Sequence, residues 1–364
     1  MQIGIMGLPG AGKTTVFNAL ARARAEVGGY SAPTAEPNIA VVKVPDPRLD
    51  ALAPLFEPKK FTPAEVQYMD VAGIVRGAGA GKDSSGSLLA RLRNVDMLLH
   101  VVRAFGSAAS QGTDPNPLDD VDAIRLELML ADMDVATKRL ERLRKEALMS
   151  KGTPAERLVR EKELEIFERL NAALEAETPL RELGLEPAEE RLLGGYGFLT
   201  LKPLLVLVNP SEPGPDVDAV VAQIEATLGP FAGATSLAGK LETELADLPP
   251  EEAAEFMEAL GIAESGLGRV IQISYKLSRL ISFFTVGEDE CRAWTIPDNS
   301  PAQEAAGAIH TDLSRGFIRA EVIHWDQLLE VQTYAEARKR GLLRSEGKAY
   351  VVQDGDVLNI LHSG

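Results

Sequence analysis

Short apolar runs alternate with helical patterns over much of the chain. The first run, Gln2 to Met6, ends in glycines and is followed by a helical pattern from Lys13 to Arg24. Similar apolar runs follow at Ile39–Val44, Val66–Met69, Met97–Val102 and Leu204–Val208. Because strands separated by helical stretches are typical of parallel sheets, this pattern predicts an α/β domain.

The hydrophobic spacing is helical throughout residues 119–195. Apolar side chains recur at nearly helical intervals from Ile124 and Leu128 to Leu140 and Leu143. After the break "SKGTP", a second helical pattern covers residues 155–177. Two long helices joined by a Gly-Pro turn predict an αα-hairpin, a coiled-coil arm inserted into the α/β domain.

The pattern becomes rich in β-strands from about Leu280. The segments "SFFTVG", "CRAWTIP", "FIRAEVI", "KAYVV" and "DVLNIL" read as strands, with a helical "PAQEAAGAI" among them. This predicts a separate, mixed α+β domain. The expected division is 1–118 with 196–280 for the α/β domain, 119–195 for the helical insertion and 281–364 for the last domain.

Composition narrows the classes of protein. Hydrophobic residues make up 45% and charged residues 25% of the 364, as in ordinary soluble globular proteins. A single cysteine, Cys291, excludes an internal disulfide framework and suits a reducing cytoplasm. No apolar stretch is long enough to span a bilayer, and the N-terminus lacks the basic region of a signal peptide. With four histidines, one cysteine and no clustering among them, we do not expect a zinc site.

The net charge of −16 argues against broad, non-specific binding of nucleic acid, which requires clustered Lys and Arg. One local exception is Lys138 to Lys151, with six basic residues against two acidic ones. Its simplest interpretation is a solvated helix face with pairs such as Glu141 with Lys145.

The strongest chemical signal is a phosphate-binding loop. Gly7-Leu8-Pro9-Gly10-Ala11-Gly12-Lys13-Thr14 has the form G-x-x-x-x-G-K-[ST], placed after a strand and before a helix. Glycines let backbone N–H groups converge on phosphate oxygens at a helix N-terminus, where the dipole favours an anion. Lys13 is expected to reach the β- and γ-phosphates and the Thr14 hydroxyl to ligate Mg²⁺, with Thr15 completing the phosphate site.

Further landmarks favour a switch-type nucleotide domain with a Ras-like G-domain fold over other P-loop proteins. In "YMDVAG", Asp70 ends a strand where it can hold the Mg²⁺ shell, and the Gly73 N–H can sense the γ-phosphate. Upstream, Thr34 lies in a loop where its hydroxyl can close over Mg²⁺. Ile74 stands where a Ras-like enzyme has a water-orienting Gln, so the catalytic group is unknown and slow hydrolysis is expected.

The end of the run Leu204–Val208 predicts an unusual base-reading loop. Ras-like GTPases have N-K-x-D there, and this chain has Asn209-Pro210-Ser211-Glu212. Pro210 cannot cover the base with a charged stem, and Glu212 is one methylene longer than Asp, so guanine discrimination should be lost. A plain strand-ending turn is the alternative interpretation.

Taken with these motifs, the chain resembles the YchF/Obg-like ATPase family almost end to end. The resemblance rests on "GLPGAGKTT", "TAEPN", "DVAGIVRGA", "NPSE", "FMEALGIAESGLGRVI" and "FFTVGEDECRAWTIP", and on the segment from "AAGAIHTDLSRGFIRAEVI" to "GKAYVVQDGDV". It implies a G domain with a coiled-coil insertion and a C-terminal TGS domain of ubiquitin-like β-grasp fold. It also implies that ATP is accepted in preference to GTP.

The resemblance extends to partners and to the last base loop. It implies association with ribosomal RNA or protein, a nucleic-acid surface between the arm and the TGS domain, and a monomer. Ala238, Gly239 and Lys240 fall in the family's last base-loop motif, although Ala238 stands where the family tends to have Ser or Cys. Gly10 replaces the Asn that helps related enzymes bind potassium, which argues against potassium stimulation. The loop "FGSAASQGTDPNPL" lacks a histidine proposed to aid hydrolysis in some members.

Two functional hypotheses follow. The first is a cytoplasmic switch, a slow ATPase or GTPase, that binds ATP or GTP with Mg²⁺ and acts on the ribosome, in translation or the stress response. The second is a nucleotide-sensing scaffold that barely turns over, favoured by Ile74, Gly10 and the missing loop histidine. A P-loop kinase is disfavoured, since it would need neither the DxxG motif nor the base loop.

Overall fold

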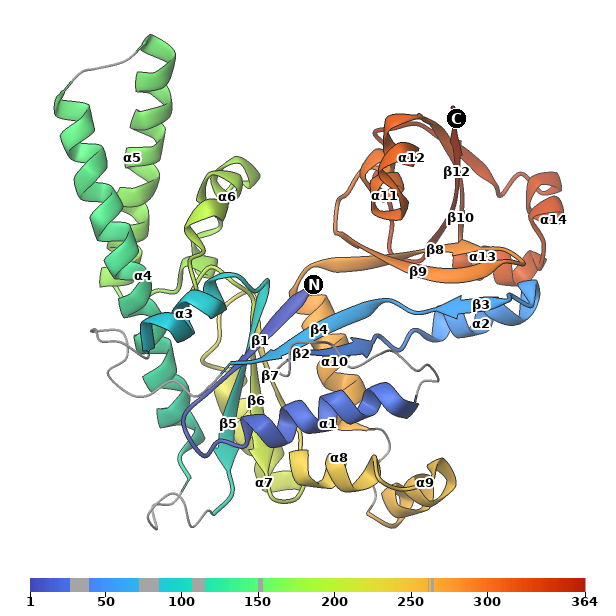
Figure 1. Cartoon of the computed structure of the whole chain (residues 1–364), viewed down its shortest axis with the longest axis horizontal. Helices are drawn as coiled ribbons and strands as arrows, with labels where there is room; N and C mark the ends of the chain where they lie inside the picture. The colour runs from blue at the N-terminus through green and yellow to red at the C-terminus, as the bar shows by residue number, and fades with distance from the viewer. Residues whose placement is uncertain are drawn as a thin grey trace. The chain divides into compact units, whose positions relative to one another are not determined.

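The computed structural model describes residues 1–26, 39–71, 85–106, 115–149, 153–260, 262 and 265–363. Figure 1 shows the chain, which divides into two compact units. The first unit consists of residues 1–41 and 67–270, and the second of residues 42–66 and 271–364. Among the described residues, no helix is long and apolar enough to cross a membrane.

A six-stranded sheet of order β2-β4-β1-β5-β6-β7 forms the centre of the first unit. Its strands are β1 (Gln2–Met6), β2 (Ile39–Lys43), β4 (Glu65–Asp70), β5 (Met97–Ala104), β6 (Leu204–Pro210) and β7 (Ala232–Ser236). The pairs from β4 through to β7 are all parallel. Every residue of β6 is buried, which explains its continuous apolar sequence. The predicted parallel α/β sheet is therefore confirmed.

Helices of the first unit connect these strands. They are α1 (Lys13–Glu26), α3 (Ser85–Arg93), α7 (Pro215–Glu225), α8 (Gly239–Leu245), α9 (Pro250–Ala259) and α10 (Gly266–Leu277), which runs on into the second unit. The strand β7 was not expected, because "AGATS" contains no apolar run. It forms by pairing with β6 between Leu204–Ala232 and Val208–Ser236.

A helical hairpin is inserted between β5 and β6. Its long helices are α4 (Pro117–Leu148) and α5 (Pro154–Glu175), which lie side by side (Figure 1). A capping box between Thr153 and Glu156 begins α5. The chain returns to the sheet through η3 (Leu180–Leu183), α6 (Pro187–Leu193) and η4 (Gly194–Tyr196). The hairpin has its own core of α4 and α5 side chains, including Leu140, Leu143, Phe167 and Leu170.

The second unit contains a six-stranded mixed sheet of order β11-β10-β12-β8-β9-β3. Its strands are β3 (Lys60–Thr62), β8 (Leu280–Val286), β9 (Glu290–Pro297), β10 (Phe317–His324), β11 (Arg344–Glu346) and β12 (Asp356–His362). Its helices are α2 (Pro47–Phe56), α11 (Ala302–Ile309), α12 (Thr311–Arg315), α13 (Trp325–Val331) and α14 (Tyr334–Lys339). An antiparallel β8–β9 hairpin, a helix, and a last strand parallel to β8 give the expected β-grasp arrangement.

Two features of the second unit differ from expectation. The segment "KAYVV" forms only a bridge between Val351 and Pro301, and the strand lies earlier, at Arg344–Glu346, where β10 supplies its backbone partners. Residues 42–66, expected in the nucleotide domain, group with the second unit because β3 pairs in parallel with β9. Arg48 also binds Asp354 at 2.7 Å.

Candidate nucleotide-binding site

The phosphate loop lies between β1 and α1, as expected. Three of its glycines have positive φ values, 152° for Gly7, 80° for Gly10 and 89° for Gly12, conformations that side chains disfavour. A Cβ atom on Gly12 would lie 2.2 Å from Nδ2 of Asn209, so only glycine fits there. A Cβ on Gly10 would meet no atom within 4 Å, so space does not restrict that position although its backbone does.

Lys13 is held inside this loop. Its side chain is largely buried, and Nζ donates to the carbonyl oxygens of Leu8 at 2.9 Å and Gly7 at 3.2 Å. Burial lowers the pKa of Lys13, an effect that the Asp70 carboxylate partly offsets. The ammonium group is therefore positioned by backbone carbonyls that a phosphate would replace as its partners.

Asp70 and Thr14 lie beside Lys13. Asp70 is the last residue of β4, next to β1 in the sheet, and its carboxylate lies close enough to the Thr14 hydroxyl and the Lys13 ammonium for both to affect its pKa. Burial raises the pKa of Asp70, and the charge of Lys13 and the Thr14 hydrogen bond partly offset this. A hydroxyl and a carboxylate are the oxygen ligands that Mg²⁺ prefers, so these residues fit that ion. Within the described ranges, no group of three His, Cys, Asp or Glu side chains forms a metal cluster.

Asn209 connects two loops that are distant in sequence. The residue is buried, its Nδ2 donates to the carbonyl of Ala11 at 3.1 Å, and its Oδ1 accepts from the Gly239 N–H at 3.1 Å. The amide thus holds the phosphate loop against the start of α8. Both of its polar atoms bond to backbone groups, which makes Asn209 a positioning residue.

The other residues of the predicted base loops lie in two places, directly after Asn209 at the end of β6 and after β7. Pro210 is buried at the end of β6, while Ser211 and Glu212 are exposed beyond it. Ala238 and Gly239 are buried, and Lys240 is exposed with Glu244 3.7 Å away. Glu242, one turn on in α8, accepts from the Gly266 N–H and the Ser265 hydroxyl, which ties α8 to the start of α10. The loops after β6 and β7 therefore meet at the phosphate loop, and an exposed Glu212 remains available to a base.

Three predicted positions, Thr34, Gly73 and Ile74, lie outside the described residues. Their assigned roles, like those of the other site residues, stay predictions.

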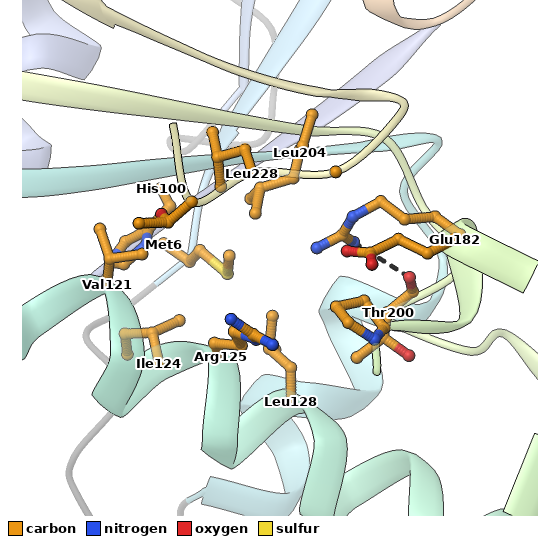
Figure 2. Close-up of a pocket in the computed structure, with 15 residues that line it drawn as sticks. Met6, His100, Val121, Ile124, Arg125, Leu128, Glu182, Thr200, Leu204 and Leu228 are labelled. Carbon is orange, nitrogen blue, oxygen red and sulfur yellow. Dashed lines mark hydrogen bonds between the residues drawn. The ribbon is translucent and has the colours of Figure 1, made fainter. Parts of the chain in front are cut away.

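A small cavity lies elsewhere in the first unit. Its volume of about 20 Å³ suits a single water and excludes a nucleotide. Figure 2 shows the residues around it, among them Met6, His100, Val121, Ile124, Arg125, Leu128, Leu204 and Leu228. His100 pairs with Met6 across β5 and β1, and its Nε2 has no hydrogen-bond partner among the described residues. Sequence reasoning passed over His100, although a histidine inside the run Met97–Val102 was the available signal.

Comparison with known proteins decides the family. A "Ribosome-binding ATPase YchF" of Pasteurella multocida is 41% identical over 367 residues, covering 98% of each chain. The Bacillus subtilis protein of the same name is also 41% identical, covering 99% of this chain and 98% of its own. The chain belongs to the YchF family.

Structure and family models agree with this membership. The solved structure of the Schizosaccharomyces pombe YchF GTPase superimposes with a TM-score of 0.86 at 31% identity, covering 99% of this chain and 97% of that one. A model described as "50S ribosome-binding GTPase" matches residues 2–137, and the YchF C-terminal model, described as a protein of unknown function, matches residues 280–363. The resemblance, the fold class and the class of enzyme, a P-loop NTPase, are confirmed.

Proposed function

We propose that this YchF protein is a nucleotide-dependent switch that binds and slowly hydrolyses ATP with Mg²⁺ in the cytoplasm and associates with the ribosome. The observation that carries the proposal is the convergence of Lys13, Thr14 and Asp70 at the end of β1 and β4. The names of the relatives, ribosome-binding ATPases, support both the nucleotide and the partner.

Different residues of the site would bind the phosphates and the Mg²⁺ ion. The loop from Gly7 to Thr15 would surround the phosphates, with Lys13 exchanging the carbonyls of Gly7 and Leu8 for phosphate oxygens. The Thr14 hydroxyl and the Asp70 carboxylate would hold Mg²⁺ or its water shell, together with Thr34. When bound, Mg²⁺ neutralises charge on the β- and γ-phosphates.

The base would be read beyond β6. Asn209 keeps that loop against the phosphate loop, and Glu212 would accept a hydrogen bond from the base edge. Guanine presents two adjacent donors, N1–H and its exocyclic amine, which a shorter Asp takes together, and Glu212 is one methylene too long for that geometry. Adenine presents a single exocyclic amine donor, which Glu212 would accept, and Pro210 removes the charged stem that covers guanine in related enzymes. We therefore propose that ATP is preferred to GTP.

Slow turnover follows from Ile74. An aliphatic side chain cannot orient or polarise water, so hydrolysis would rely on Mg²⁺, Lys13 and the loop N–H groups. The same residue favours the second candidate, a nucleotide-sensing scaffold without appreciable turnover. In either case the γ-phosphate would order the segments that contain Thr34 and Gly73.

The proposal is tested with Lys13→Ala. Without the ammonium group, binding of ATP with Mg²⁺ should fall at least a hundredfold, and hydrolysis above background should be lost. Binding is measured with a fluorescent ATP analogue and turnover with γ-labelled ATP. The matched control is Lys59→Ala, an exposed lysine of the second unit, which should bind as the wild type does. Near-normal affinity in a folded Lys13→Ala protein would refute the phosphate-loop assignment. Binding without turnover in the wild type would favour the scaffold.

A further inference from the structure

The end of the α4–α5 hairpin exposes several large apolar side chains. Leu148 and Met149, at the end of α4, are 85% and 65% exposed, and Leu158 and Val159, early in α5, are 55% and 59% exposed. We call these four residues the distal surface. All four lie next to the connection between the helices, within the part that Figure 1 draws as a pair of helices extending from the first unit.

Packing of the hairpin does not account for this surface. The buried residues of α4, Ala136, Leu140 and Leu143, follow a spacing of four and three, and those of α5 include Phe167, Leu170 and Leu174. Continued along each helix, this spacing passes through residue 147 of α4 and residues 163, 160 and 156 of α5. The distal surface therefore lies off the seam between the helices.

Ion pairs replace apolar packing as the hairpin approaches its end. Arg139 donates two hydrogen bonds to Glu163, at 2.9 and 2.8 Å, and Arg160 lies 3.8 Å from Glu146. Polar groups thus hold the helices together here. The apolar residues of the distal surface are left outside this packing, each with more than half of its surface exposed.

Positive charge surrounds the distal surface. Residues 138–149 and 153–162 contain eight basic and four acidic side chains, in a chain whose net charge is −16. Four of the eight form ion pairs with carboxylates, namely Lys138, Arg139, Arg144 and Arg160. Arg142, Lys145 and Lys162 are exposed and form no ion pair with any residue that the structure describes. The basic stretch that sequence alone interpreted as a solvated face therefore borders an apolar patch.

We propose that the distal surface docks on an acidic protein, into an apolar groove bordered by carboxylates. Charge complementarity selects an acidic partner, and the apolar side chains select a protein over RNA, because phosphate contacts use basic residues and would leave Leu148 and Leu158 in water. The inference rests on the proposed association with the ribosome, of which this partner would be a protein component.

Co-sedimentation of the full chain with purified 70S ribosomes tests the proposal. The double variant Leu148→Ser/Leu158→Ser should bind at least about tenfold more weakly than the wild type, because buried apolar anchors dominate protein interfaces. The matched control is Ile318→Ser/Val351→Ser, which makes the same kind of change at side chains of the second unit that are 59% and 41% exposed. It should bind within about twofold of the wild type. Circular dichroism checks that each variant is folded.

A photo-crosslinking residue at position 158 identifies the class of partner. The expected product on 70S ribosomes is a protein adduct at an acidic segment, lost when unlabelled wild-type protein competes. An rRNA adduct overturns the inference in favour of RNA. Equal sedimentation of the wild type and the distal variant also overturns it, while leaving the proposed ribosome association intact. If the wild type itself does not sediment, the ribosome association is wrong and the inference falls with it.

Discussion

Asn209 and Glu212, close in sequence, face different surroundings. Asn209 is buried and bonds to the backbone of Ala11 and Gly239, while Glu212 is exposed beyond the end of β6. One residue therefore assembles the site and the other is free to meet a ligand. The need for glycine at position 12 follows from the same contact, since any Cβ there would displace the Asn209 amide.

The grouping at the phosphate loop could be expected from sequence, whereas the role of Asn209 could not. Lys13, Thr14 and Asp70 follow neighbouring strands, and the carboxyl ends of parallel strands meet at one edge of a sheet. The partners of Asn209 lie 198 and 30 positions away along the chain. No local pattern indicates those contacts, because they depend on how closely the loops approach.

His100 provides a prediction about pH. Complete burial and the nearby charge of Lys13 lower the pKa of His100 to about 3, so the imidazole is neutral in the folded protein at neutral pH. In the unfolded chain its pKa is about 6.5. The unfolded state therefore binds the extra proton first, and stability is lost as pH falls below about 6.5. Between pH 7 and pH 5, His100 should remove about 2 kcal/mol of unfolding free energy.

Urea unfolding of the wild type and of His100→Leu at both pH values measures how much unfolding free energy His100 removes. The difference between the two pH-dependent losses isolates His100 from the many acidic residues that titrate in the same range. The wild type should lose about 2 kcal/mol more than His100→Leu. Equal losses would mean that His100 becomes protonated without unfolding.

At the scale of elements, a buried carboxylate joins α3, α4 and the chain before β6. Asp132 of α4 is completely buried and accepts from the N–H groups of Leu199 at 2.9 Å and Thr200 at 2.7 Å. Its carboxylate also accepts from the Thr200 hydroxyl at 2.8 Å and from Arg93, the last residue of α3, at 3.2 Å. Asp132 thus fixes the base of the hairpin to the helix that follows Asp70 and the DxxG motif.

Removing this carboxylate should be strongly destabilising. Asp132→Ala leaves the buried N–H groups of Leu199 and Thr200 without their acceptor and removes the ion pair with Arg93, which keeps only backbone carbonyl partners. We expect a loss of about 3–5 kcal/mol. The midpoint and slope of urea unfolding measure it. Asp134→Ala is the control, since Asp134 lies on the same helix but is exposed and pairs with the exposed Lys138. It should change stability by less than about 0.5 kcal/mol, and similar losses in both variants would contradict the structural role of Asp132.

Elements with strong periodicity could be read from the sequence, and those formed by pairing could not. Apolar runs predict the strands β1, β5 and β6. Long helical patterns predict α4 and α5. The strands β3, β7 and β11 are short or polar, and they exist because β9, β6 and β10 offer unpaired backbone groups. The burial of Asp132 was less evident from the sequence. Its only indication was a carboxylate spaced between Leu128 and Ala136 on a largely apolar helix face.

On the scale of the whole molecule, the chain passes from the first unit to the second at about residue 42, returns near 67, and leaves again near 271. Residues 42–66 thus belong to the second unit but are covalently connected at both ends to the sheet of the first unit, through β2 and β4. Asp70, at the end of β4, is four residues beyond that segment. Sequence patterns did not reveal this short covalent connection between Asp70 and the second unit.

The preference of this site for ATP over GTP is the most discriminating property that we propose. Its most direct test is equilibrium titration of the purified protein with fluorescent ATP and GTP analogues in the presence of Mg²⁺, each competed with the unlabelled nucleotide. ATP should bind at least several-fold more tightly than GTP, because Pro210 and Glu212 replace the residues that select guanine. Clearly tighter binding of GTP would contradict it and would show that the loop after β6 still reads guanine.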